Sequence, residues 1–381
     1  MLKNLKKVLI LFTISYLIII TNVFIYDTHA SENEVVQTYT GDNGVTIISY
    51  SKNWSTKDKL EEIYEELISN FHSEEMNYLK KIYIYPNSKE GVAGYYYNKY
   101  SINSRGRYKM ENNRYIEIFN GDKYTRIEEI ARTLSHEYGH HFTTYYVLTK
   151  ENRSMKDWGD EVYLKVRGIE NYYKQIDDIS EIAAEDYVQL FGSELTKKSV
   201  DYKDVKERIE GGIKKYYYSS NSYNLVPQQN LEIPLAANID GLANYWIGLV
   251  GKPCYEPNPP NKVNLKIVES KEIYINKYQY KFEWEPVEES NERYEYTLVL
   301  YNNVLDFPQP IKTVYTGEKM EAYTGYGYRK MENNKIRVIE DNYKGEYKLK
   351  LFIKDERNFI YCKDELKVKF DKSGRYKIIE D

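Results

Sequence analysis

Two histidines and a glutamate stand at the spacing that zinc chemistry requires, in the segment His136-Glu137-Tyr138-Gly139-His140. The chain contains only five histidines among its 381 residues, so chance rarely produces this His-Glu-x-x-His pattern. Neutral imidazoles are common zinc ligands, and a neighbouring carboxylate can take a proton from a water that the metal activates. The pattern therefore indicates metal-assisted hydrolysis. The alternative is a helix with two surface histidines and no metal.

On a helix, two histidines four residues apart can reach one metal ion. Thr125-Arg126-Ile127-Glu128 is a capping-box start, and an apolar stripe at helical spacing follows it. We therefore expect a helix over residues 126–146. The stripe consists of Ile127, Ile130, Ala131, Leu134 and Tyr138.

Successive residues of a helix are about 100° apart, which places His136 and His140 within about 40° of each other on one face. Glu137 lies too far round to share the coordination, but it stands beside the open position of the metal. We expect Glu137 to act as the general base. His141 turns toward the apolar stripe, so we expect a packed or supporting histidine and not a ligand.

A catalytic zinc ion needs three protein ligands and one open position, so a third ligand must come from elsewhere in the chain. Asp178-Ile179-Ser180-Glu181 predicts the start of a second helix that runs through Leu190 and ends at Gly192. Glu181 and Glu185 lie one turn apart on it, away from its apolar face. Like charges at this spacing repel each other slightly, and a nearby dication would reverse that effect. The alternative is a solvated acidic face.

The two motifs together resemble those of the gluzincin metallopeptidases, in particular the group of anthrax lethal factor and the Pro-Pro endopeptidases. The resemblance rests on residues 136–140 followed by Glu181-Ile182-Ala183-Ala184-Glu185-Asp186. It implies that Glu181 joins the two histidines as the third ligand of one catalytic Zn²⁺. It also implies that Glu185 supports His136, and that the domain has a zincin-like α+β fold.

The same group has a tyrosine seven residues before the ligand glutamate, where it stabilises the oxyanion. Lys174 occupies that position here, and Tyr172 and Tyr173 precede it. The resemblance therefore assigns this catalytic role first to Tyr173 and second to Tyr172. In such enzymes an edge strand binds the peptide substrate by strand addition. Residues 115–119 resemble that strand, and an ordinary core strand is the alternative.

On this resemblance, the expected activity is that of a zinc metalloendopeptidase acting on protein or peptide substrates, with Glu137 as the base. One alternative is a secreted surface-binding or adhesion protein with an inactive peptidase-like domain. Such a degraded site should have lost Glu137 or a ligand, and all four candidate groups are present. The other alternative is a zinc amidase acting on cell-wall peptide.

Residues 1–30 have the features of a signal peptide. Three lysines precede an apolar run over residues 8–25, and Thr28-His29-Ala30 provides small residues at the two positions a signal peptidase reads. Polar residues interrupt the run, which favours cleavage over the alternative of an N-terminal membrane anchor. Abundant Lys, Asn, Ile and Tyr are typical of an AT-rich genome. We expect a secreted protein of a Gram-positive bacterium.

The rest of the chain divides into two parts. Residues 31–252 mix strands and helices without regular alternation, which favours an α+β metallopeptidase domain. Residues 253–262 hold four of the ten prolines and predict a linker. Residues 263–381 alternate with a period of two, which predicts an all-β sandwich. Residues 282–286 and 294–298 resemble a fibronectin type III domain, an immunoglobulin-like fold, which we expect to target the cell surface or the substrate.

Charge and cysteine content narrow the possible partners. A net charge of −4 with both signs mixed argues against nucleic acid as a partner. The only cysteines are Cys254 and Cys362. A disulfide and two free thiols are equally consistent with the sequence, whereas a thiolate metal site is not expected.

Overall fold

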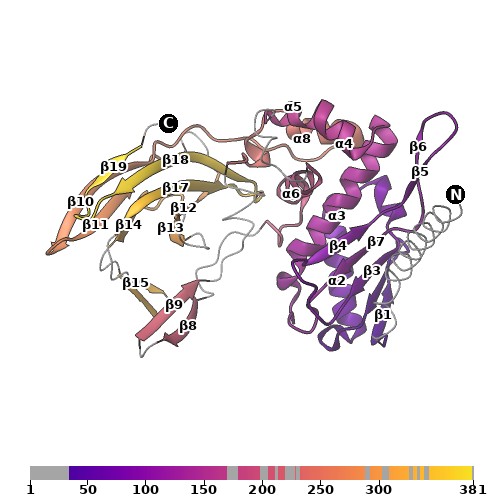
Figure 1. Cartoon of the computed structure of the whole chain (residues 1–381), viewed down its shortest axis with the longest axis horizontal. Helices are drawn as coiled ribbons and strands as arrows, with labels where there is room; N and C mark the ends of the chain where they lie inside the picture. The colour runs from indigo at the N-terminus through magenta and orange to yellow at the C-terminus, as the bar shows by residue number, and fades with distance from the viewer. Residues whose placement is uncertain are drawn as a thin grey trace, which may run out of the picture.

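The computed structural model describes residues 34–169, 179–197, 205–210, 213–218, 228, 232–287, 292–302, 309–325, 329–332, 335–338 and 343–379. Its first part mixes helices and strands, and its last part is an all-β region (Figure 1). In this general form the expected fold class is confirmed. The expected signal peptide lies outside the described residues. Among the helices that are described, none is both long and apolar enough to cross a bilayer.

A five-stranded mixed sheet forms the base of the first part. Its strands are β1 (Gln37–Thr40), β2 (Thr46–Ser49), β3 (Lys81–Ile84), β4 (Gly94–Tyr97) and β7 (Tyr115–Ile118). The order is β1-β2-β3-β7-β4, with β2, β3 and β7 parallel and an antiparallel strand at each edge. Strand β7 therefore has neighbours on both sides, and the expectation that residues 115–119 form the edge strand is wrong. The chain between β3 and β7 lies along the outside of β7 as β4, which takes the edge position.

The two faces of this sheet differ in composition. Alternate residues of a strand point to opposite faces, and isoleucines such as Ile82 are fully buried on one face. Tyrosines occupy the other face and stack on one another. The ring centroids of Tyr97 and Tyr115 are 4.7 Å apart, and those of Tyr50 and Tyr85 are 5.2 Å apart. Such cross-strand pairs stabilise a sheet, so part of the high tyrosine content has a structural role.

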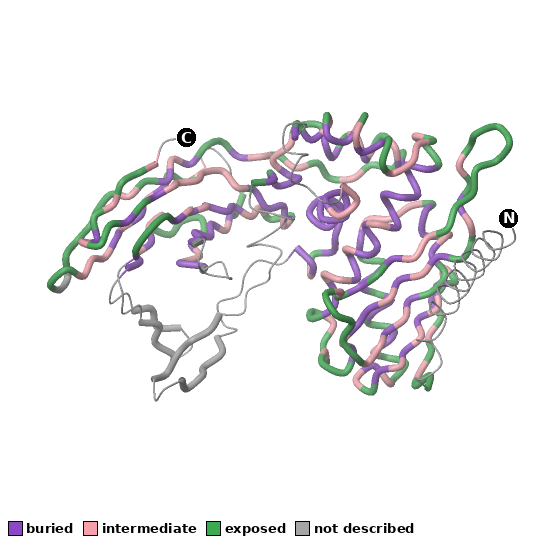
Figure 2. The backbone as a smooth tube through the Cα atoms, in the orientation of Figure 1, coloured by how far each residue is buried: buried purple, intermediate pink, exposed green. Residues whose placement is uncertain are grey.

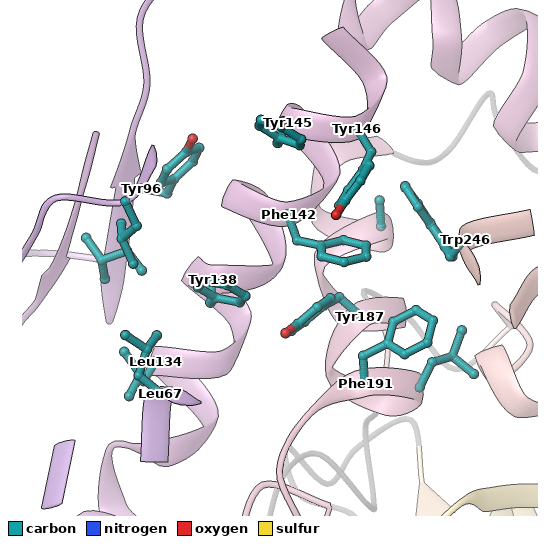
Figure 3. Close-up of a cluster of buried hydrophobic side chains, with 14 of the residues drawn as sticks. Leu67, Tyr96, Leu134, Tyr138, Phe142, Tyr145, Tyr146, Tyr187, Phe191 and Trp246 are labelled. Carbon is teal, nitrogen blue, oxygen red and sulfur yellow. The ribbon is translucent and has the colours of Figure 1, made fainter. Parts of the chain in front are cut away.

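The helices of the first part pack on one another through aromatic side chains. They are α2 (Lys57–Ser69), α3 (Ala131–Tyr146), α4 (Met155–Trp158), α5 (Leu164–Arg167), α6 (Ile179–Phe191) and α8 (Leu242–Val250). The side chains of α6 are buried from residue 182 to residue 191, and its backbone is purple at the centre of Figure 2. Phe142 of α3 packs against Tyr187 of α6 and Trp246 of α8, with ring centroids 4.8 and 5.6 Å away (Figure 3).

Helix α3 begins later than expected. Residues 127–129 form a 3₁₀ turn, and the α-helix starts at Ala131 and not at Arg126. The carboxylate of Glu129, and not that of Glu128, accepts hydrogen bonds from the backbone N–H groups of Thr125 and Arg126, at 2.8 and 3.1 Å. The N-cap of this turn is Arg126 and not Thr125, so the acidic residue of the capping box also falls one residue later. The helix then continues to Tyr146, as expected.

The C-terminal part consists of antiparallel sheets with their own hydrophobic core. One sheet contains β10 (Lys266–Tyr274), β11 (Lys277–Glu283) and β14 (Glu321–Gly325). The other has the order β13-β12-β17-β18-β19, formed by β12 (Glu295–Asn302), β13 (Gln309–Tyr315), β17 (Gly345–Lys354), β18 (Ile360–Phe370) and β19 (Tyr376–Ile378). Their shared core includes Phe282, Leu298 and Leu349, all fully buried.

Three short hairpins complete the described strands. The first, β5 (Tyr100–Ile102) with β6 (Tyr108–Met110), projects from the edge of the N-terminal sheet (Figure 1). The others are β8 (Val205–Glu210) with β9 (Ile213–Tyr218), and β15 (Arg329–Glu332) with β16 (Lys335–Val338).

The β-sheet region packs directly on the helical part. Val188 of α6 belongs to a small apolar cluster with Val299 and Phe352 of the C-terminal sheet. The side chain of Asn238 also pairs with the backbone of Cys362, donating to its carbonyl at 3.1 Å and accepting from its N–H at 2.9 Å. Cys254 and Cys362 are free thiols in the structure, which decides between the two alternatives that the sequence left open.

Candidate metal centre

Three side chains from two helices converge on one point. His136 and His140 extend from α3, and Glu181 extends from the first turn of α6. The Nε2 atom of His136 lies 3.0 Å from Oε2 of Glu181, and Nε2 of His140 lies 3.3 Å from Oε1. One nitrogen or oxygen atom from each residue lies within 4.8 Å of the others. The three residues therefore form a possible metal-binding triad.

The separations can be compared with those around a metal ion. Zinc holds nitrogen and oxygen ligands at 2.0–2.1 Å in a tetrahedron, which places neighbouring ligand atoms about 3.3 Å apart. The distances of 3.0 and 3.3 Å from the two histidines to Glu181 are close to this value. Small adjustments of the side chains would bring all three donors to bonding distance, so the residues fit a zinc ion.

The close crossing of α3 and α6 brings the three side chains of the triad together. Gly139 lies at the crossing, where a Cβ atom would be 2.9 Å from the carbonyl oxygen of Ala184. Only a residue without a side chain lets the two backbones approach so closely. Glu181 is one turn before Ala184, so the crossing places its carboxylate opposite the histidines that flank Gly139.

Glu185 contacts the far side of the His136 ring. Its Oε1 atom lies 3.1 Å from Nδ1 of His136 and accepts a hydrogen bond of 2.6 Å from Nη2 of Arg132. The contact to Nδ1 is an ion-pair distance, although among the described residues Nδ1 has no partner at ordinary hydrogen-bond angles. A small rotation of the ring would align Nδ1 with the carboxylate for a hydrogen bond. Carboxylates commonly orient metal-bound histidines in this way.

The charges of the cluster shift the pKa values of its members. Burial alone would lower the pKa of His136, but Glu185 and Glu181 raise it to about 10. Hydrogen bonds from His136 and His140 hold the pKa of Glu181 well below its usual range. Burial raises the pKa of Glu185, and the charges of Arg132 and His136 outweigh it and lower the pKa. A metal ion needs neutral imidazoles, so its binding would release the proton that His136 otherwise holds.

Glu137 lies in the same cleft as the triad but is not part of it. Its side chain is buried against β4, where a Cβ atom on Gly94 would stand 2.7 Å from Oε1 of Glu137. Burial raises the pKa of Glu137, while the charges of His136 and His140 act in the opposite direction. A carboxylate beside a metal site can accept a proton from water and return it.

The cleft around these groups has a volume of about 860 Å³. Residues 91–96, which include most of β4, form one wall, and α3 forms the other. The edge strand at the site is therefore β4, whose only neighbour among the described strands of the sheet is β7. Met155 and Lys156 of α4 also line the cleft.

The remaining site candidates have different outcomes. Tyr172 and Tyr173 lie outside the described residues. His141 is fully buried and packed, as expected, and burial together with the nearby charge of Arg114 lowers its pKa to about 3. Arg132 and Gly94 were not anticipated. Arg132 lies one turn before His136 on the same helix, so helical spacing could have identified it as a neighbour of the site. No local sequence pattern distinguishes Gly94.

No protein-family model matches the chain, and no curated protein matches it either.

Proposed function

We propose that this protein is a zinc-dependent endopeptidase in which His136, His140 and Glu181 hold the metal. The observation that carries the proposal is the approach of both histidine Nε2 atoms to the Glu181 carboxylate, at 3.0 and 3.3 Å, in a cleft that also contains Glu137. Two imidazoles and one carboxylate form a ligand set of catalytic zinc in peptidases. We also propose that the first part of the chain has a zincin-like fold.

Each residue has a defined task in this reaction. When bound, zinc would supply Lewis acidity, which polarises a peptide carbonyl and makes water more acidic. Glu137 accepts a proton from the attacking water and returns it to the departing amine nitrogen, which breaks the carbon–nitrogen bond. Glu185 keeps the ring of His136 turned so that Nε2 faces the metal. For the hydroxyl that stabilises the oxyanion, the resemblance to gluzincins still favours Tyr173 before Tyr172.

The cleft wall suggests how the substrate binds. In the described sheet β4 is an edge strand that pairs with β7, and three of its four residues line the cleft. An extended peptide can add to such an edge by backbone hydrogen bonds. Its scissile bond would then lie between β4 and the ligand helix α3, which favours protein or peptide substrates.

Export and targeting remain part of the proposal. Residues 1–30 would direct secretion, and the C-terminal β-sheets, which resemble a fibronectin type III domain in sequence, would serve targeting to a cell surface or a substrate. An adhesion protein with an inactive site is less well supported, because Glu137 and the three ligand groups are all present and gathered in one cleft.

The test is hydrolysis of a diverse peptide library by purified residues 31–381, followed by mass spectrometry, with cell-wall peptides included as a separate pool. We expect cleavage within extended peptides that a chelator abolishes and added zinc restores. Cleavage of the cell-wall pool alone would indicate the amidase. No cleavage of either pool by zinc-loaded protein would contradict the proposed activity.

A further inference from the structure

We propose that His141 and Tyr96 are positioning residues that hold the edge strand β4 at a fixed place beside the ligand helix α3. The proposal rests on the proposed function, because it concerns the strand on which a peptide substrate would lie. His141 follows the ligand His140 directly but points away from the cleft, into the protein.

A chain of hydrogen bonds joins the two elements. The ring of His141 contacts the ring of Tyr96 edge to face, with centroids 5.4 Å apart. The hydroxyl of Tyr96 lies 3.1 Å from Nδ1 of His141, and Nε2 of His141 lies 2.8 Å from the backbone carbonyl oxygen of Glu75. Arg114, fully buried just before β7, donates from Nη1 to the Tyr96 hydroxyl.

The direction of every bond in this chain is determined. A carbonyl oxygen only accepts, so Nε2 of His141 must carry the proton. In the neutral ring Nδ1 is then an acceptor, and the Tyr96 hydroxyl must donate to it. The hydroxyl oxygen in turn accepts from Arg114, which can only donate. No member can reverse its role, so the loss of one group leaves a buried polar partner unsatisfied.

A second contact lies one step along the same two elements. Gly94 of β4 touches Glu137 of α3 so closely that a Cβ atom would be 2.7 Å from it. Gly94 and Tyr96 are two residues apart on a strand, a rise of about 6.7 Å. Glu137 and His141 are four residues apart on a helix, a rise of about 6 Å. The two spacings match, so β4 is held at two successive points along α3.

This arrangement determines the width of the cleft at the candidate base. The contact of Gly94 with Glu137 limits how closely β4 can approach α3. The hydrogen bond from Tyr96 to His141 prevents β4 from moving away from α3. Tyr95, between the two contacts, is on the opposite side of the strand and is 49% exposed. A substrate strand paired to β4 would inherit this position, so the loss of the bond should weaken substrate binding more than the chemical step.

The test compares Tyr96→Phe with Tyr146→Phe in the zinc-loaded chain. Tyr146 is also buried, and its hydroxyl donates to a carboxylate oxygen of Glu75 at 2.6 Å. Tyr138 also donates to that carboxylate, so the loss of the Tyr146 hydroxyl removes no bond between β4 and α3. Both variants lose one buried hydroxyl and should lose similar stability. We expect Tyr96→Phe to raise KM about tenfold with a smaller change in kcat, at unchanged zinc content. We expect the kinetics of Tyr146→Phe to stay within about twofold of the wild type.

Two substitutions of His141 separate its two bonds. Asparagine can keep an acceptor near the position of Nδ1, and glutamine can keep a donor near the position of Nε2. His141→Asn should therefore retain the link to Tyr96 and have the lower KM of the two. Equal KM values for both variants, or a KM of Tyr96→Phe equal to that of Tyr146→Phe, would overturn the proposal.

Amide hydrogen exchange provides a measurement that does not depend on activity. We expect faster exchange across β4 and its partner β7 in Tyr96→Phe than in the wild type, and no such change in Tyr146→Phe. Unchanged exchange in Tyr96→Phe would overturn the positioning role. If the wild type cleaves no peptide but amide exchange across β4 and β7 is faster in Tyr96→Phe, the proposed function fails and the positioning role stands.

Discussion

The Nδ1 atom of His136 lies 3.1 Å from Oε1 of Glu185, on the side of the ring opposite to Glu181. One imidazole therefore stands between two carboxylates, with Nε2 toward the candidate metal position and Nδ1 toward a buried, charged support. A proton held on Nδ1 leaves the lone pair of Nε2 available for a metal. Because Arg132 also binds Glu185, the support itself is fixed in place.

Glu185→Gln should weaken zinc binding without abolishing it. The amide keeps the size of the carboxylate but removes the charge that orients His136, and the loss of such a support lowers metal affinity by about 10- to 100-fold. Competition with a chelator of known affinity measures the change. Glu194→Gln, an exposed acidic residue just after the same helix, is the matched control and should bind zinc like the wild type. Equal affinity in both variants would contradict the role of Glu185.

Glu181→Gln should lose stoichiometric zinc. The substitution replaces a charged carboxylate by a neutral amide, which is a poor ligand for zinc. Only the two histidines then remain to bind the metal. Elemental analysis after dialysis should find far less than one zinc per chain, against one for the wild type. Retention of a full equivalent by Glu181→Gln would show that another group completes the site.

Gly94→Ala should lower activity while zinc remains bound. The added methyl group would stand 2.7 Å from Glu137, a contact that forces the carboxylate or the strand to move. Displacement of a general base typically costs about 10²-fold in rate or more. Gly248→Ala on α8, where a Cβ atom meets nothing within 4 Å, is the control. Wild-type kcat/KM in Gly94→Ala would refute the tight contact.

Lys197 should make the stability of the protein depend on pH in the alkaline range. Burial lowers its pKa from the usual 10.5 to about 8. Between these values the unfolded chain binds a proton that the folded chain has released, so stability rises with pH. The shift corresponds to roughly 3 kcal/mol. The free energy of unfolding, measured with denaturant, should therefore increase for the wild type relative to Lys197→Met between pH 7 and pH 10. A difference that does not change with pH would contradict this.

Helical periodicity accounts for the parts of the site that could be predicted. The shared face of His136 and His140 follows from a spacing of four residues, as does the pair of Glu181 and Glu185 on the second helix. The burial of His141 follows from its position one residue further round. Such relations depend on a single helix, and they persist whatever the helix packs against.

The parts that were missed depend on contacts between distant segments. Residues 115–119 have the alternation of any half-buried strand, and only pairing with β4 and β3 decides that β7 is internal. Gly94 is one of twenty glycines, and its importance arises from the approach of α3. Arg114 and Tyr96 meet His141 only after the sheet has formed. A local pattern identifies a segment as a strand, but it does not determine which strands lie beside it in the sheet.

The most direct test of the account measures zinc content and peptide hydrolysis on the same preparations of the wild type and Glu137→Gln. Because Glu137 stands beside the triad without belonging to it, both proteins should hold one zinc per chain. Only the wild type should cleave peptides efficiently, with kcat in the variant lower by about 10²- to 10⁴-fold. A wild type that binds no zinc, or a Glu137→Gln variant that cleaves as fast as the wild type, would contradict the central claim.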